Sequence, residues 1–201
     1  MKISISIVII TVFVSFTGCV SYSTLQSAKT LDPGSVLIGG GSAFPMDANS
    51  IGIFPEVNAR VGIVPDFDFG LKYSLPSLYF LDGKLQLIDG PITLSADVGW
   101  SYFSYSGGNG TSKGKSTGWY PMLIAGQDHW YAAVKGVYFQ TKGEFEFFGL
   151  QTFDGSGWIS TNVVFGGVIG SDVRLLPEIN VIIPKKGKTL FVPSVGLQFV
   201  F

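Results

Sequence analysis

The sequence predicts an all-β fold, an antiparallel up-and-down barrel of about ten strands that crosses a membrane. Three observations lead to this prediction. Apolar and polar residues alternate with a period of two along most of the chain. Tight turns and longer connections follow one another in strict alternation. Charged residues make up only 13% of the sequence, whereas an average soluble domain carries roughly 25%.

The composition also excludes several classes of protein. A hydrophobic content of 46% with a net charge of −1 excludes a disordered chain. Thirteen Lys and Arg residues against fourteen Asp and Glu leave no basic excess for phosphates, so we expect no nucleic-acid partner. One Cys and one His cannot build a disulfide framework or a zinc site. We therefore expect no metal and no other cofactor.

Residues 1–18 are predicted to be a signal peptide. Met1 and Lys2 precede an apolar run that ends near Phe16. This run is shorter than the ~20 residues of a membrane-spanning helix and fits a secretory hydrophobic region of ~7–15 residues. No later window holds eighteen consecutive apolar residues, so no transmembrane helix is expected downstream.

The run ends in Phe16-Thr17-Gly18-Cys19, which resembles the lipobox of bacterial lipoproteins. The resemblance implies cleavage before Cys19 and attachment of lipid, palmitate included, to its thiol and its new amino group. An ordinary signal peptide with an incidental cysteine is the alternative. Residues 19–34 are then expected to form a short, lipidated periplasmic tether.

Residues 35–201 contain the alternating segments and form the expected barrel domain. In 53–63, for example, Val57 and Val61 face one side while Glu56 and Arg60 face the other. A face this apolar, repeated from segment to segment, requires an apolar environment. The predicted strands are 35–44, 53–63, 67–75, 80–88, 92–105, 118–125, 130–140, 158–170, 173–183 and 189–201.

The connections between these segments favour a membrane barrel. Turns with Gly, Pro and Asp at 64–66, 89–91, 126–129 and 170–172 alternate with longer links, the longest at 106–117 and 141–157. Short periplasmic turns and longer outer loops are typical of outer-membrane barrels with an even strand number. Eight strands are the alternative count. A soluble β-sandwich is a second alternative, but its outer face should be rich in Lys and Glu.

The last eight residues resemble the β-signal of bacterial outer-membrane barrels. Its slots are filled by Ser194, Gly196, Phe199 and the terminal Phe201. The chain is therefore similar, over 35–201, to the small bacterial outer-membrane β-barrels. The resemblance implies an outer-membrane location, contact with membrane lipid, and insertion by the barrel-assembly machinery through the C-terminal strand.

Turning the polar faces inward places nine charged side chains in the lumen. Folding 53–63 back on 67–75 about Pro65 brings Arg60 diagonally near Asp68 and sets Asn58 opposite Lys72. Because so small a barrel is nearly filled by its own side chains, we expect ion pairs that largely close it. A path for an ion or solute is the alternative. The nine are Glu56, Arg60, Asp68, Lys72, Lys84, Asp97, Lys135, Arg174 and Glu178.

The leading functional hypothesis is a non-enzymatic, monomeric outer-membrane lipoprotein barrel with a structural or narrow-pore role. An alternative is surface recognition through 106–117 and 141–157, with lipopolysaccharide or a host surface ligand as partner, because 141–157 is rich in phenylalanine. A second alternative is a lipid-modifying enzyme that uses His129 as a base. His129 falls in a predicted periplasmic turn, so we do not expect an enzyme.

Overall fold

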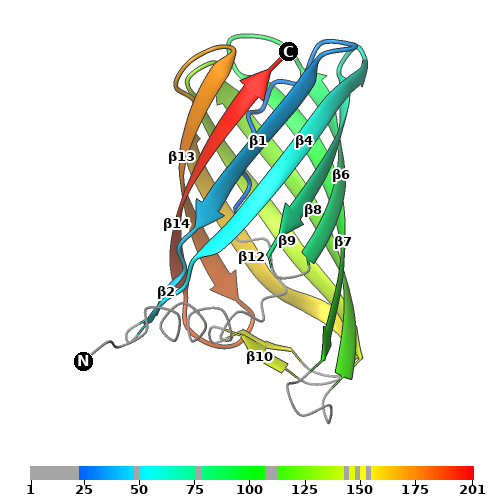
Figure 1. Ribbon diagram of the computed structural model, residues 1–201, viewed down its shortest axis with the longest axis vertical. Helices are drawn as coiled ribbons and strands as arrows, with labels where there is room; N and C mark the ends of the chain where they lie inside the picture. The colour runs from blue at the N-terminus through cyan, green and yellow to red at the C-terminus, as the bar shows by residue number, and fades with distance from the viewer. Residues whose placement is uncertain are drawn as a thin grey trace, which may run out of the picture.

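Ten strands close into one antiparallel barrel in a computed structural model that describes residues 23–47, 50–75, 78–106, 113–142, 145–147, 150–152 and 155–201 (Figure 1). The predicted all-β, ten-stranded antiparallel barrel is therefore confirmed. Its strands are β1 (Val36–Ala43), β4 (Phe54–Val64), β5 (Phe67–Ser74), β6 (Leu78–Ile88), β7 (Thr93–Ser106), β8 (Lys113–Gln127), β9 (Trp130–Lys142), β12 (Gly155–Gly167), β13 (Val173–Pro184) and β14 (Leu190–Val200).

Neighbours in the barrel follow the order of the chain, and the barrel is closed by pairing of its first and last strands. β1 lies antiparallel to β14, with Leu37 opposite Val200 and Ala43 opposite Ser194. Two small hairpins lie outside the barrel sheet, one of β2 (Met46–Asp47) with β3 (Ser50–Ile51), the other of β10 (Phe145–Phe147) with β11 (Leu150–Thr152). Within the described residues, no helix is long and apolar enough to cross a membrane.

The two ends of the barrel differ, and we name them by their connections. At the short-turn mouth, turns at 65–66, 89–92, 128–129 and 168–172 join the strands. β1 begins and β14 ends at this same mouth (Figure 1, upper end). The remaining connections meet at the opposite end, the long-loop mouth. Each connection lies at the end of the barrel where it is predicted, but the lengths do not alternate strictly, because β5 and β6 are joined by 75–77, which is shorter than the turn at 89–92.

The long connection predicted at 106–117 is shorter than expected. Residues 113–117 belong to β8, whose pairing with β7 extends as far as Ser106 opposite Lys113. Their Gly, Ser, Thr and Lys content resembles a loop, yet backbone hydrogen bonds to a neighbouring strand do not require apolar side chains. The connection predicted at 106–117 therefore reduces to residues 107–112.

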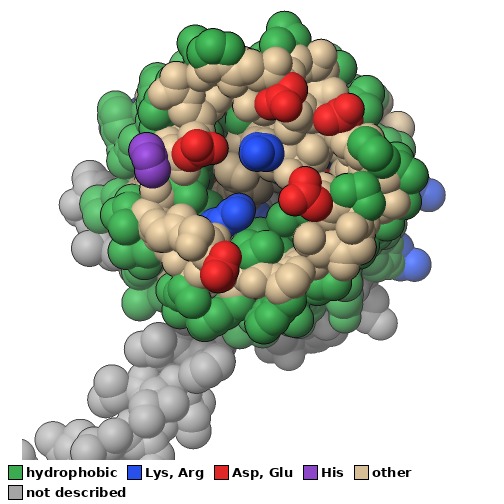
Figure 2. Space-filling view, turned by 90° about the horizontal axis from the view of Figure 1, so that it is seen from above, with side chains coloured by type: hydrophobic (Ala, Val, Ile, Leu, Met, Phe, Trp, Pro, Cys, Tyr) green, Lys and Arg blue, Asp and Glu red, His purple; other side chains and the backbone are tan. Residues whose placement is uncertain are grey.

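The barrel wall is apolar outside and polar inside. Val57, Leu123 and Phe165 are 55–58% exposed on the outer face, whereas Asp68 and Asn180 are 0% exposed. Viewed into the short-turn mouth, hydrophobic side chains form the outer ring, acidic side chains lie around the opening, and basic side chains are visible within it (Figure 2). A soluble protein has the reverse arrangement, so this surface is the one expected of a barrel in lipid.

The chain before β1 differs from its prediction. Residues 23–31 lie within the barrel and residues 32–34 are exposed at its short-turn mouth, with Ser23, Leu25 and Ala28 each only 1% exposed. They run from the lumen to the short-turn mouth, where the backbone N–H of Gly34 donates to the carbonyl of Gly62 at 2.9 Å. The tether expected over 19–34 is wrong for 23–34. The predicted signal peptide and Cys19 lie outside the described residues.

Candidate functional site

The lumen is occupied by residues 23–34, which we call the N-terminal plug. Its contacts are ordered along the barrel axis. Ser23 contacts Glu56 of β4 in the half of the lumen nearer the long-loop mouth. Leu31 contacts Asp68, the second residue of β5 after the short turn. The plug therefore extends from the interior to the short-turn mouth, antiparallel to β1, which follows it.

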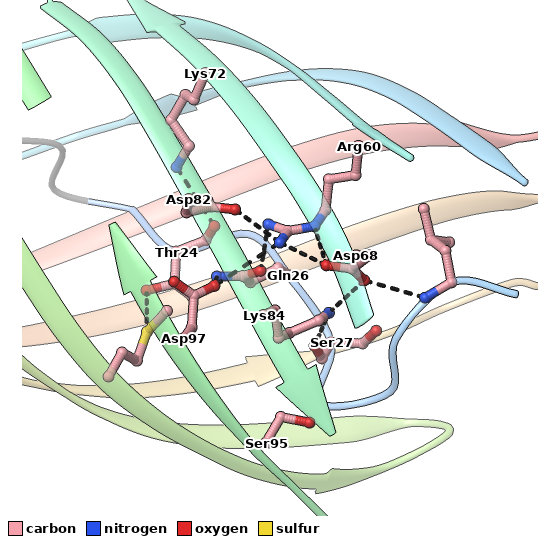
Figure 3. Close-up of polar contacts among 12 residues, drawn as sticks. Thr24, Gln26, Ser27, Arg60, Asp68, Lys72, Asp82, Lys84, Ser95 and Asp97 are labelled. Carbon is pink, nitrogen blue, oxygen red and sulfur yellow. Dashed lines mark hydrogen bonds and ion pairs between the residues drawn. The ribbon is translucent and has the colours of Figure 1, made fainter. Parts of the chain in front are cut away.

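Arg60 is the centre of a buried ion cluster on β4–β7 (Figure 3). Its Nη2 lies 2.7 Å from Oδ1 of Asp68 and 2.7 Å from Oδ1 of Asp82. Asp97 lies farther away, at 3.8 Å. Lys84 lies 3.3 Å from the second oxygen of Asp68. Three acids thus surround one guanidinium, whose planar set of donors suits several carboxylates at once.

The plug completes this cluster through Gln26. Nη1 of Arg60 donates to Oε1 of Gln26 at 2.6 Å, and Nε2 of Gln26 donates to Asp97 at 2.9 Å. One amide side chain therefore links the cation to the most distant of its acids. Buried polar groups are costly unless they are hydrogen-bonded, so Gln26 stabilises both the cluster and the position of the plug.

A second ion pair lies deeper in the barrel, where the described plug begins. Lys72 lies 3.3 Å from Glu56, and the Ser23 hydroxyl donates to Glu56 at 2.5 Å. The carbonyl of Ser23 accepts hydrogen bonds from Lys72 at 3.2 Å and from Lys135 at 3.4 Å. Two lysines on opposite sides of the lumen, on β5 and β9, therefore converge on one backbone carbonyl.

Glu178 of β13 binds the plug through backbone amides. The N–H groups of Thr24 and Leu25 donate to its two oxygens at 2.8 and 2.7 Å. The Tyr131 hydroxyl donates at 2.7 Å, and the Asn180 amide donates at 2.7 Å. Four donors around one buried carboxylate compensate for its lost hydration.

The opposite side of the plug is apolar. Leu25 and Ala28 pack into a cluster of buried side chains on β8, β9, β12 and β13 and on the turn after β12. The other members are Met122, Ile124, Tyr131, Ala133, Val164, Val168 and Leu176. The plug therefore turns a polar side to the ion cluster and an apolar side to the facing wall, and both sides of the lumen hold it.

A second apolar cluster fills the barrel toward the long-loop mouth. The rings of Phe80 and Tyr120 lie 4.9 Å apart, and Phe139 meets Tyr120 edge-on at 5.9 Å. The sequence predicts that mainly polar faces line the lumen and does not reveal this cluster, although Phe54, Phe80 and Tyr120 have the parity of inward residues. Its buried members are Ala43, Phe54, Phe80, Tyr120, Val137, Phe139, Ile182, Leu190 and Val192.

Little space is left beside the plug. The gap between Thr24–Gln26 and the wall of β4–β6 has a volume of about 10 Å³, which is room for about one water molecule. At the short-turn mouth, a recess of about 370 Å³ is lined by Lys29, His129 and Arg174, and another of about 210 Å³ lies beside Asp32 and Asp128. Between the plug and β4–β6, the described residues therefore leave no continuous water path at the level of the ion cluster.

The predicted lumen residues are nearly all found inside the barrel. Arg174 is the exception, because its guanidinium lies at the short-turn mouth and donates to the carbonyl of Ser171 at 2.7 Å. Asp82 is an inward acid that the sequence analysis does not single out, although it has the same parity as Lys84. The others, each 0–8% exposed, are Glu56, Arg60, Asp68, Lys72, Lys84, Asp97, Lys135 and Glu178.

Other candidate residues lie away from the lumen cluster. His129 is exposed in the turn between β8 and β9. Ser194 and Gly196 face inward on β14, whereas Phe199 and the terminal Phe201 are 41% and 75% exposed. Among the residues that the structure describes, no group of three or more His, Cys, Asp or Glu side chains is arranged to hold a metal ion.

The comparisons with known proteins assign the chain to no family. No family model matches the chain, and no curated protein matches it. Among solved structures, the N-terminal β-barrel domain of OprF from Pseudomonas aeruginosa is 11% identical with a TM-score of 0.38, over 85% of this chain and 100% of that one. The transport unit of the autotransporter AIDA-I from Escherichia coli is 10% identical with a TM-score of 0.42, over 96% and 97%. Neisserial surface protein A is 14% identical with a TM-score of 0.29, over 83% and 96%. These similarities are low, and the assignment of the fold rests on the strand pairing described above.

Proposed function

We propose that this protein is a non-enzymatic β-barrel lipoprotein of the bacterial outer membrane with a structural role and a closed lumen. The observation that carries the proposal is the N-terminal plug, held by buried ions and leaving a gap of about 10 Å³ beside it. A narrow-pore role would need a continuous water path, and a gap for about one water molecule does not provide it.

The membrane part of the proposal is supported by the outer face of the barrel. Side chains such as Leu71, Val98 and Val134 are 48–53% exposed on it although they are apolar. Exposed apolar area of this extent needs a partner, and lipid covers all sides of a barrel at once. Attachment of lipid at Cys19 and insertion through the C-terminal strand ending in Phe201 belong to the same proposal.

The charge pattern of the lumen supports a structural role. Five buried acids face four buried bases, and the described contacts join them to each other or to the plug. Ions that pair with each other stabilise a fixed arrangement, whereas a selective pore lines its path with one sign of charge. Catalysis by His129 lacks support, because its exposed turn lies at the rim of the barrel.

The purified full-length protein in planar bilayers tests the closed lumen, and heat-modifiable migration on a gel tests the barrel. We expect a heat-dependent shift and no single-channel steps. Regular steps from folded protein would contradict the structural role. Acyl labelling of the wild type, lost in Cys19→Ala, tests the lipid anchor separately, since labelling that persists in the variant would refute attachment at this residue.

Surface recognition is a second candidate, favoured by the uneven height of the barrel. β7, β8, β9 and β12 have 13–15 residues, whereas β1, β4, β5 and β6 have 8–11. One side of the wall therefore extends farther at the long-loop mouth, where the hairpin β10–β11 lies (Figure 1, lower right). Replacing residues 145–152 by a short Gly-Ser link should reduce binding of lipopolysaccharide or host-cell surfaces, and unchanged binding would reject this candidate.

A further inference from the structure

The lumen binds the N-terminal plug mainly through the plug's main chain. Carboxylates accept from backbone N–H groups, since Glu178 binds Thr24 and Leu25 and Asp68 accepts from Leu31 at 3.0 Å. Three lysines donate to backbone carbonyls. Lys84 reaches those of Ser27 and Lys29, both at 3.0 Å, while Lys72 and Lys135 reach that of Ser23.

Neutral lumen side chains continue the same pattern. Gln86 accepts from the N–H of Thr30 at 3.1 Å, and Gln198 donates to the carbonyl of Leu25 at 2.7 Å. The Ser95 hydroxyl donates to the carbonyl of Ala28 at 2.5 Å. Backbone groups are present in every peptide whatever its sequence, so these contacts recognise a polypeptide main chain rather than one particular sequence. This main chain is irregular and not fully extended, because Leu25 has a positive φ of 47°.

One plug side chain is recognised by shape. Gly41 and Gly196 lie opposite each other on β1 and β14, and both face the side chain of Leu25. A Cβ atom added at Gly196 would lie 3.0 Å from Cδ1 of Leu25, and one added at Gly41 would lie 2.6 Å from the same atom. The two glycines therefore form a recess that accepts a leucine side chain.

We propose that the lumen is a binding site for an irregular, non-helical polypeptide segment, and that residues 23–34 are its resident occupant. Once this segment is released, the site accepts another peptide in trans, provided that it presents a leucine-sized apolar side chain to the Gly41–Gly196 recess. The inference goes beyond the structural role, and it depends on neither lipid attachment nor conduction.

The chemistry of the site favours a peptide over other ligands. Carboxylates and ammonium groups follow one another along the lumen from Lys72 and Glu178 to Lys84 and Asp68, and a peptide main chain offers both N–H donors and C=O acceptors to them. A simple ion would satisfy only one sign of charge. A lipid chain would leave the buried charges without hydrogen bonds, which is costly.

The test releases the plug from the folded full-length protein. A protease recognition sequence is inserted between Gly34 and Ser35, which lie at the short-turn mouth where Gly34 is exposed. The chain is folded in detergent and cut, and the cleaved N-terminal segment is washed off the immobilised barrel with urea. Heat-modifiable migration checks that the barrel persists, and mass spectrometry checks that the segment has left. A synthetic peptide of residues 23–34, labelled at its C-terminus, is then added and its fluorescence anisotropy is measured.

We expect saturable binding to the cut barrel and at least tenfold weaker binding to the uncut barrel, whose lumen is occupied. N-methylation of the peptide at Leu25 and Leu31 should weaken binding at least tenfold, because it removes two N–H donors. A Leu25→Ser peptide should also bind more weakly. A Lys29→Ala peptide is the matched control and should bind like the parent, because the Lys29 side chain is exposed.

The proposal is overturned if the intact cut barrel binds no peptide, or if the N-methylated peptide binds as well as the parent. A second measurement needs no cleavage. In the uncut protein, backbone hydrogen exchange of residues 24–31 should be protected, and Glu178→Gln should accelerate it at least tenfold at residues 24 and 25, whereas Arg174→Gln should not. Exchange as fast as in the free peptide would equally refute main-chain recognition.

Discussion

Arg60 is the cation at the centre of the buried ion cluster. It contacts Asp68 and Asp82 at 2.7 Å and the plug residue Gln26 at 2.6 Å, while only 8% exposed. Removing one partner of a buried ion pair leaves an uncompensated buried charge, which costs more than the intact pair contributes. The three acids near Arg60 would all be affected by its loss.

Arg60→Ala is therefore expected to lower the free energy of unfolding by about 3–5 kcal/mol. Urea unfolding in detergent, followed by tryptophan fluorescence and heat-modifiable migration, measures the change. Arg174→Ala is the matched control, since this arginine lies at the short-turn mouth, and its effect should stay within about 0.5 kcal/mol. Equal effects of the two substitutions would show that the buried cluster is not a stabilising element.

Gly99 allows an aromatic ring to lie flat across the lumen wall. A Cβ atom at this position would overlap the ring of Phe80 on the neighbouring strand, which in turn packs against Tyr120. Gly83 on β6 is different, because its nearest neighbour would be the ring of Phe67 at 3.4 Å, an ordinary contact. The sequence shows only that both are glycines in strands.

Gly99→Ala should destabilise the barrel by about 1–3 kcal/mol, the usual cost of overpacking. Gly83→Ala should change it by less than about 0.5 kcal/mol. The same urea titration compares the two variants. In the double variant Gly99→Ala/Phe80→Leu, the smaller side chain should recover part of the loss, and a double variant no better than Gly99→Ala would contradict the steric explanation.

At the scale of elements, the strands were predictable and the N-terminal plug was not. The strand predicted at 53–63 corresponds to β4 (Phe54–Val64), and Arg60 meets Asp68 as its register implied. Alternation reveals a strand because its two faces lie in different environments. Residues 23–34 have no such alternation, and their positions depend on backbone groups, which are the same in every sequence.

Some lumen residues could not be identified from the sequence, for related reasons. The strand predicted at 80–88 has a broken alternation, so Asp82 does not stand out beside Lys84, although both prove to be buried. Phe54, Phe80 and Tyr120 are apolar on the inward face, and a lumen assumed to be polar conceals them. A pattern of side chains shows which face differs from the other, but it does not show what fills the enclosed space.

The plug as an element is expected to resist proteolysis at Lys29. The backbone carbonyl of Lys29 accepts a hydrogen bond from Lys84 at 3.0 Å, and the N–H of the next residue, Thr30, donates to Gln86 at 3.1 Å. A protease needs this stretch of backbone free and extended. Lys84→Met should therefore make trypsin cleave after Lys29 at least tenfold faster, as followed by mass spectrometry.

The exposed residue Lys185, between β13 and β14, supplies the control within the same digest. Cleavage after Lys185 should proceed at equal rates in the wild type and in Lys84→Met. If cleavage after Lys29 were equally fast in both proteins, the bond from Lys84 would not hold the plug in place.

At the scale of the whole molecule, the distribution of polarity decides between a barrel in lipid and a barrel in water. In water, the outer face would carry the charges and the lumen would need none. Here Asp68, Lys84 and Asp97 are inside, each at most 2% exposed, while Leu71 and Ile88 are 48% and 53% exposed outside. The depth of each outer position in a bilayer then determines how much a charge would cost there.

Leu71 and Ile88 allow this distinction to be measured. Leu71 lies midway along β5, opposite Ala59 and Leu81, whereas Ile88 ends β6 beside a short turn. In a bilayer, Leu71→Arg should cost about 2–4 kcal/mol and Ile88→Arg only about 0–1 kcal/mol, because charge is most costly at the midplane. Urea unfolding in lipid vesicles measures both variants. Two small and equal effects would mean that water surrounds the barrel. A large effect confined to Leu71→Arg would locate the middle of the bilayer at the height of Ala59 and Leu71, the level at which Arg60 and the N-terminal plug close the lumen.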